Sequence, residues 1–348
     1  MCSSDLKTFT PGSTNAAGND IGVDLTFSQG GAPRVVGLQL AISHVSIANA
    51  RANLDAEGQG HGFDEVAAEA RRVWQDRLGV IRIDGGTPEQ RANFYTALFR
   101  CFQMPTVFND ANGEYLGFDR QVHRADGFRY FTDMSLWDTF RTTHPLYTLI
   151  APADQLDMVR SLVRMAVEGG WLPRWPSGGG YSNSMFGTPA DIVVADTYLK
   201  GLRDFDVEKA YEAMRRTALA STPPGSAFSG RHGAEHVATL GYCPDDLMEK
   251  SVASTLEYAW SDHAIANLAE MKPAAQVYDF IFAFPQDPDQ DRELINAVGT
   301  ARNAYFGMAF DLTPRPSTAE SAPVSDAVAQ YLHNSLWRIQ IDVSSDGI

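Results

Sequence analysis

A run from Tyr130 to Arg141 holds two carboxylates, an indole and a guanidinium among aromatic residues. If it is helical, Asp138 and Arg141 share a face, because side chains three or four positions apart are neighbours. Asp133 and Trp137 share a face by the same rule. This set suits a sugar ring, whose apolar side stacks on an indole while its hydroxyls bond to charged groups. It equally suits a helix anchored by a buried ion pair.

A second segment, residues 168–185, is predicted to be a loop. Pro173 and Pro176 remove backbone donors, and three consecutive glycines follow them. The loop carries Trp175 and Asn183, and binding residues concentrate on loops of rigid scaffolds. The alternative is a loop folded over the protein's own core.

Two further carboxylates, Asp191 and Asp196, follow this loop and are weaker candidates for ligand binding. They are five positions apart, so one straight helix does not direct both at a single ligand. Any two of the aspartates at 133, 138, 191 and 196 have the chemistry of an acid and base pair. Spacing singles out none of them, and the catalytic residues therefore stay unassigned.

The histidines and cysteines suggest no metal site. His144 precedes a proline and is interpreted as a packed or hydrogen-bonded residue. His232 and His236 are four apart, but their glycine-containing surroundings predict a loop rather than a metal-binding helix. Three cysteines without close spacing indicate neither a disulfide framework nor a zinc pattern.

Many separate pieces of the chain, in order, resemble glycoside hydrolase family 92, the calcium-dependent exo-acting α-mannosidases. The resemblance covers about residues 35–270 and is specific because it rests on the whole series rather than on one motif. The matching pieces are residues 48–54, 94–99, 117–119, 130–141, 144–146, 169–176, 185–191, 195–201 and 254–262.

The resemblance implies hydrolysis of terminal α-linked mannose from glycans, as in N-glycan degradation, by an inverting mechanism that calcium assists. It implies an (α/α)6 toroid of helical hairpins behind an N-terminal β-sandwich, and an exported, periplasmic or secreted protein. The residues that it points to as substrate contacts are Trp137, Asp138, Arg141, Trp175 and Asn183, with Asp191 and Asp196 as weaker ones.

The chain departs from the family pattern after about Met271. The segments that carry the family's general acid, general base and most calcium ligands do not appear, so calcium is implied without identifiable ligands. We therefore expect a partial sequence that is inactive alone and that self-associates through uncovered apolar surface. The alternatives are a carbohydrate-binding remnant that does not cleave, and another (α/α)6-toroid carbohydrate-active enzyme.

Composition and periodicity give the frame that positions these residues. A net charge of −15 argues against nucleic acid as a partner. No apolar run is long enough to span a membrane, and residues 1–5 do not resemble a signal peptide. We predict a mainly α protein with a strand over 35–47. Helices are predicted at 49–57, 63–78, 88–104, 138–150, 154–167, 191–202, 207–220 and 250–269.

The predicted organisation has four parts. Residues 1–47 are the last strands of a β-sandwich, and 48–86 are a helical linker. Residues 87–270 form the first part of the toroid, and 271–348 are a divergent or truncated tail.

Overall fold

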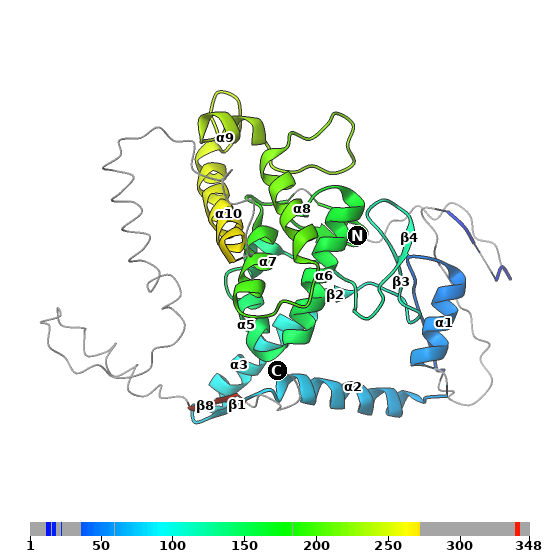
Figure 1. Ribbon diagram of the computed structural model, residues 1–348. Coiled ribbons are helices and arrows are strands. Elements are labelled where there is room, and N and C mark those ends of the chain that lie inside the picture. The colour runs from blue at the N-terminus through cyan, green and yellow to red at the C-terminus, as the bar shows by residue number, and fades with distance from the viewer. Residues whose placement is uncertain are drawn as a thin grey trace, which may run out of the picture. The chain divides into compact units, whose positions relative to one another are not determined.

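The computed structural model describes residues 12–14, 16–18, 22, 36–58, 60–182 and 184–271, and the backbone of 338–341. The chain separates into two compact units, Met1–Gln39 and Leu40–Ile348. The described residues of the first unit include no helix or strand. The second unit is mainly helical, as predicted (Figure 1). The toroid and the four-part division of the chain stay predictions.

The helices and strands follow one another without forming a large sheet. The helices are α1 (Ile47–Glu57), α2 (Phe63–Leu78), α3 (Pro88–Gln103), α4 (Leu136–Thr139), α5 (Thr143–Ile150), α6 (Pro152–Gly169), α7 (Pro189–Leu199), α8 (Val207–Leu219), α9 (Ala234–Leu240) and α10 (Ser251–Met271). The described residues form four antiparallel strand pairs: β1 (Ile81–Asp84) with β8 (Arg338–Ile341), β2 (Thr106–Val107) with β5 (Phe131–Thr132), β3 (Glu114–Leu116) with β4 (Val122–Arg124), and β6 (Pro176–Ser177) with β7 (Gly180–Tyr181). Within the described part of the chain, no helix is long and apolar enough to cross a membrane.

The core lies where α6, α7, α8 and α10 pack together, the green and yellow helices of Figure 1. Helix α7 is apolar on nearly all sides, which is why Val193, Val194 and Tyr198 are all buried. Helix α10 covers α7 and α8 with Ile265 and Leu268, both fully buried. This packing holds α10 beside the loop that precedes α7, and so sets the position of the candidate site.

Local sequence signals account for several helix ends. Helix α3 begins as predicted, because the Thr87 hydroxyl accepts a hydrogen bond from the Gln90 amide and the Gln90 side-chain oxygen accepts one from the Thr87 amide. Proline at the first helical position, Pro88, reinforces this start. The helix predicted at 138–150 is instead two helices, α4 and α5, separated at residues 140–142.

Two other predictions were wrong. Residues 36–46 are irregular rather than a strand, and α1 begins at Ile47. The alternating apolar residues there are exposed, Leu40 at 79% for example, and no strand of the described chain pairs with them. His236 lies in helix α9 rather than in a loop. The helix was missed because Gly233, at its N-cap, has a left-handed φ of 67° and reads as a turn.

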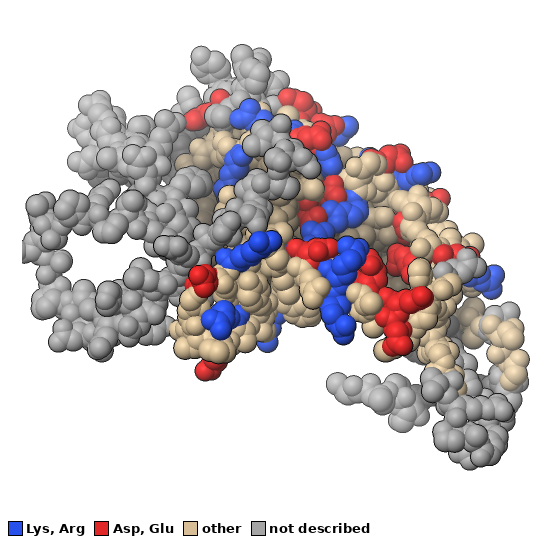
Figure 2. Space-filling view, turned by 90° about the horizontal axis from the view of Figure 1, so that it is seen from below, with Lys and Arg blue, Asp and Glu red and all other residues tan. Residues whose placement is uncertain are grey.

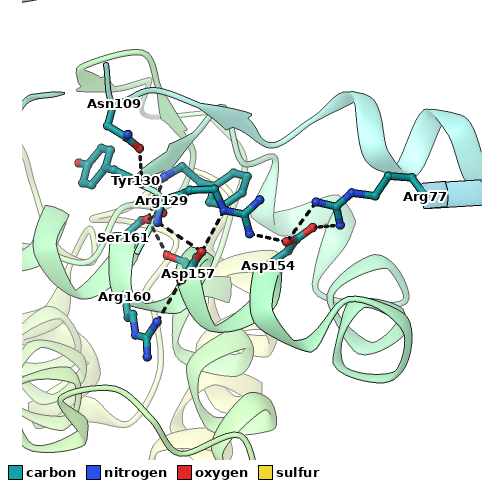
Figure 3. Close-up of polar contacts among 9 residues, drawn as sticks. Arg77, Asn109, Arg129, Tyr130, Asp154, Asp157, Arg160 and Ser161 are labelled. Carbon is teal, nitrogen blue, oxygen red and sulfur yellow. Dashed lines mark hydrogen bonds and ion pairs between the residues drawn. The ribbon is translucent and has the colours of Figure 1, made fainter. Parts of the chain in front are cut away.

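A chain of alternating ion pairs fastens the segment before the site to α6 (Figure 3). Asp154 accepts from Arg77 of α2 at 2.6 Å and also from Arg129. Arg129 also forms an ion pair with Asp157 at 3.1 Å, and Asp157 forms another with Arg160 at 3.0 Å. On the face shown in Figure 2, basic and acidic side chains intermingle in the same manner. These pairs place β5, and with it the start of α4, against the N-terminal half of α6.

Candidate functional site

Helix α4 presents two of the predicted site residues on its outer side. Leu136 and Phe140 are buried and anchor the turn. Between them, Trp137 is half-buried and Asp138 is exposed. Among the residues that the structure describes, the Asp138 carboxylate has no hydrogen-bond or ion-pair partner, so it is available to a ligand.

Trp137 is held by a carboxylate from a distant helix. Its indole Nε1 donates a hydrogen bond to Oε1 of Glu257, on α10, at 3.1 Å. The guanidinium of Arg141 lies 3.6 Å from the same Oε1 atom. One carboxylate oxygen therefore fixes both an aromatic and a basic side chain of the run from Tyr130 to Arg141.

Arg141 is also held by stacking on aromatic rings. Its guanidinium carbon lies 4.8 Å from the centre of the Trp137 ring, 4.6 Å from that of Phe140 and 5.8 Å from that of Trp260. Trp260 meets Phe140 edge to face and remains 44% exposed. We call Trp137, Phe140, Arg141, Glu257 and Trp260 the α4–α10 cluster. Arg141 covers one face of the Trp137 indole, which leaves the exposed Trp260 as a second surface for stacking.

A glycine packs closely against Glu257 of this cluster. Gly187 has a left-handed φ of 68°, and a Cβ added there would lie 3.0 Å from Cβ and 3.2 Å from Oε2 of Glu257. A side chain at this position would be strained and would press on the glutamate. The close approach of the loop before α7 to Glu257 thus requires glycine.

The loop that carries Trp175 is tied to the strand leading into α4. Asp133, at a positive φ of 57°, accepts hydrogen bonds from the Gly178 amide at 3.0 Å and the Ser177 hydroxyl at 3.2 Å. Thr132 donates to the Gly178 carbonyl at 2.7 Å. A strained aspartate is characteristic of a backbone that its surroundings hold in place. The half-buried Trp175 is therefore carried by a segment fixed beside the start of α4.

Asp191 lies in a buried polar network rather than on an open surface. Thr188 donates to its Oδ2 at 2.5 Å, and the buried Arg231 lies 3.6 Å from the same atom. Arg231 is closer to Asp262, at 2.6 Å. Oδ1 of Asp191 has no hydrogen-bond partner, and burial raises the pKa of this carboxyl to about 7. Through Arg231, which lies in the segment before α9, Asp191 of α7 is linked to Asp262 of α10.

The comparison with protein families now decides the assignment. Residues 49–281, more than half of the chain, match the family described as the glycosyl hydrolase family 92 catalytic domain. The chain belongs to glycosyl hydrolase family 92.

Solved structures of family 92 agree with this assignment. The chain is 32% identical to a GH92 alpha-mannosidase from Bacteroides thetaiotaomicron in complex with mannoimidazole, with a TM-score of 0.61 over 66% of this chain and 29% of that one. It is 33% identical to a GH92 inverting mannosidase from Bacteroides thetaiotaomicron VPI-5482, with a TM-score of 0.60 over 66% of this chain and 31% of that one.

A curated relative gives the same picture of partial coverage. An uncharacterized secreted glycosidase from Arthroderma benhamiae is 24% identical over 251 residues, which are 68% of this chain and 28% of that protein. The chain thus spans less than a third of the length of these relatives.

The structure brings some of the predicted contacts of this family 92 chain together and separates others. Trp137 and Arg141 meet at Glu257, with Asp138 adjacent on α4. Asp196 is instead paired with Lys200 at 2.7 Å, one turn later on α7. Asn183 lies outside the described residues. These ligand-binding roles stay predictions.

Sequence reasoning did not single out Glu257 and Trp260, although both lie in the family-like piece 254–262. Their three-residue spacing on a helix places them on one face, and that spacing was the available signal. Their partners are more than a hundred residues away, which no local pattern reveals.

Among the described residues, calcium, which the family resemblance implies, finds no fitting site. In the parts of the chain that the structure describes, no three His, Cys, Asp or Glu side chains are grouped as metal ligands. Calcium prefers six to eight oxygen ligands, including several carboxylates. At the α4–α10 cluster, Oε1 of Glu257 is already engaged by two basic or N–H groups. We therefore assign no metal to these residues.

His144 has the surroundings of a structural residue. His144 is buried, and its Nδ1 lies 2.9 Å from Oε1 of Gln155. Burial lowers the pKa of His144 to about 4, which keeps the ring neutral near pH 7.

Proposed function

We propose that this chain serves the hydrolysis of terminal α-linked mannose from glycans, such as N-glycans, by the inverting, calcium-assisted mechanism expected for its family. Family membership supports the reaction class. The observation that carries the site is that Glu257 joins Trp137 and Arg141 into one face, beside the exposed carboxylate of Asp138. An aromatic surface bordered by fixed charges is suited to a neutral ring rich in hydroxyls.

Binding of one mannose residue is the role of the α4–α10 cluster in this proposal. The exposed Trp260 ring offers an apolar surface to the C–H side of the sugar. Asp138 accepts hydrogen bonds from sugar hydroxyls, and Arg141 donates to ring or hydroxyl oxygens. Trp175 extends this surface from the neighbouring loop, which Asp133 holds. Asn183, which lies outside the described residues, is proposed as a further contact. Asp191 contributes through the packing of α7 rather than through direct contact.

Cleavage needs more than this cluster provides. An inverting glycosidase uses two carboxyl groups roughly 6.5–9.5 Å apart, one protonated and one ionised. In the cluster, Oε1 of Glu257 is already engaged by the Trp137 indole and by Arg141. We propose that the 348-residue chain alone binds mannose and does not hydrolyse it.

The experiment is a pair of measurements on the 348-residue chain. Calorimetric titration with methyl α-mannoside should show saturable binding that Asp138→Ala weakens about tenfold or more, since a lost hydrogen bond to a charged group has such an effect. Asp126→Ala, a substitution at another exposed aspartate, is the control. Release of a phenol from an aryl α-mannoside should stay at background with and without calcium. Calcium-dependent turnover would contradict the non-cleaving role, and absence of binding would contradict the site.

We further propose that the described helices belong to an (α/α)6 toroid and that the chain associates with a second copy of itself. Packing between helices that are near in sequence, α6 with α7 and α6 with α8, supports the toroid. Val252 and Leu256 on α10 are 72% and 67% exposed and lie one turn apart, which supports association.

A further inference from the structure

Glu257 has two carboxylate oxygens in different situations. Oε1 accepts the hydrogen bond of Trp137 at 3.1 Å and faces Arg141 at 3.6 Å. For Oε2, the described residues supply no hydrogen-bond donor. A carboxylate has about four lone-pair positions, so half of its accepting capacity remains.

The free oxygen is within reach of a ligand. The Glu257 side chain is 20% exposed, so part of it remains accessible to solvent. Its helix is anchored by the buried Tyr258 and Ile265. The carboxylate is therefore fixed in place before any ligand arrives, and such preorganisation reduces the entropy that binding costs.

Gly187 keeps the space beside Oε2 open. A Cβ at this position would lie 3.2 Å from Oε2 and would narrow the approach to it. The left-handed φ of 68° makes glycine the residue that fits without strain. Glycine is often found where a backbone or a ligand must approach closely.

The neighbouring charges select the kind of ligand. Glu257 and Arg141 neutralise each other in part, and Asp138 adds a negative charge at the rim. A second anion would be repelled, whereas an uncharged molecule with several hydroxyls finds acceptors at two carboxylates and an apolar surface at Trp260.

We propose that Glu257 is a substrate-binding residue, in which Oε1 positions Trp137 and Arg141 while Oε2 accepts a hydrogen bond from one hydroxyl of the sugar. This inference rests on the proposed function and adds to it a specificity-determining residue. A purely positioning role for Glu257 is the competing account, and the experiment separates the two.

The first arm of the experiment measures binding of methyl α-mannoside and its four monodeoxy derivatives to the wild-type chain and to Glu257→Gln. The glutamine keeps a carbonyl oxygen for the Trp137 indole and replaces the other acceptor by a donor. We expect Glu257→Gln to weaken mannoside binding about tenfold or more. The deoxy derivative that lacks the hydroxyl bound by Oε2 should bind the wild type about as weakly as the parent sugar binds Glu257→Gln. The substitution should not weaken the binding of this derivative any further. Glu270→Gln, an exposed glutamate on the same helix, is the matched control and should bind like the wild type.

The second arm records the indole N–H resonance of Trp137 by NMR without ligand. It should stay close to its wild-type position in Glu257→Gln and move in Glu257→Ala. Equal weakening of all five sugars in Glu257→Gln would overturn the direct contact, and an unmoved indole resonance in Glu257→Ala would overturn the positioning role. If the wild type binds no mannoside, the proposed function itself fails and the substrate-binding role of Glu257 fails with it.

Discussion

The indole Nε1 of Trp137 donates a hydrogen bond of 3.1 Å to Oε1 of Glu257, which joins residues 120 positions apart in the chain. Helix α4 is only four residues long and has no side-chain cap, so this bond to α10 supplies an anchor that the helix lacks locally. Short helices owe most of their stability to such tertiary contacts. The same bond fixes the orientation of the face on which Asp138 and Arg141 lie.

Replacing Gly187 by alanine should destabilise the fold by about 1–3 kcal/mol, because the left-handed backbone is strained for alanine and its Cβ would press on Glu257. Gly127→Ala is the control, since Gly127 has a similar φ of 77° with open space around it. Urea unfolding should show a larger loss for Gly187→Ala. Equal losses would mean that the contact with Glu257 has no energetic consequence.

The stability of the fold should depend on pH through Asp191. Burial raises the pKa of this carboxyl from 3.8 to about 7, so the folded state binds the proton more tightly than the unfolded state. Stability contributed by this group therefore falls as pH rises from about 4 to about 7, by at most about 1.4 kcal/mol per pH unit.

The measurement is the free energy of unfolding of wild type and Asp191→Asn between pH 4.5 and 8. The wild type should lose stability relative to the variant as the pH rises. A wild type that instead gains stability over this range would show that Arg231 holds Asp191 ionised.

The ion-pair chain on α6 should respond to the loss of Asp154. This aspartate is shared by Arg77 and Arg129, and its side chain is 11% exposed. Asp154→Ala should cost about 1–3 kcal/mol, because two guanidinium groups lose their partner while remaining partly in water. The Asp126 side chain, which pairs with Arg124, is 82% exposed. Asp126→Ala should therefore change the free energy of unfolding by less than about 0.5 kcal/mol. A similar effect of both substitutions would argue against a structural role for the network in Figure 3.

Self-association should depend on the exposed face of α10. Sedimentation of the wild type is expected to show an average mass that increases with concentration, and Leu256→Lys should reduce it by placing a charge on the apolar face. Leu149→Lys alters another exposed leucine, on α5, and should leave the association unchanged. A monomeric wild type at every concentration would refute the proposal of a second copy.

The sequence predicts those elements whose signals are local. Helix α2 has the predicted bounds, and Thr87 with Gln90 marks the start of α3 through a side-chain pattern that needs no distant partner. The break between α4 and α5 carries no proline or glycine, so local signals did not reveal it.

Features that depend on partners far away in the sequence could not be predicted from local sequence patterns. The alternation near Leu40 is a genuine strand pattern, yet a strand exists only with a hydrogen-bonded neighbour. The site shows the same limit: the residue types at Trp137 and Arg141 suggested a ligand, whereas the carboxylate that holds them, Glu257, is far away in sequence. Likewise, no pattern around Asp191 signals Arg231, whose guanidinium lies 3.6 Å from this buried carboxylate.

The central claim, that the α4–α10 cluster binds a sugar, is tested most directly by NMR of the tryptophan indoles during titration with methyl α-mannoside. Resonances are assigned by single substitutions. The account predicts that the signals of Trp137 and Trp260 shift saturably, while those of Trp74, on α2, and the buried Trp171 stay in place. A titration that leaves Trp137 and Trp260 unmoved, or that shifts Trp74 or Trp171 instead, would contradict it.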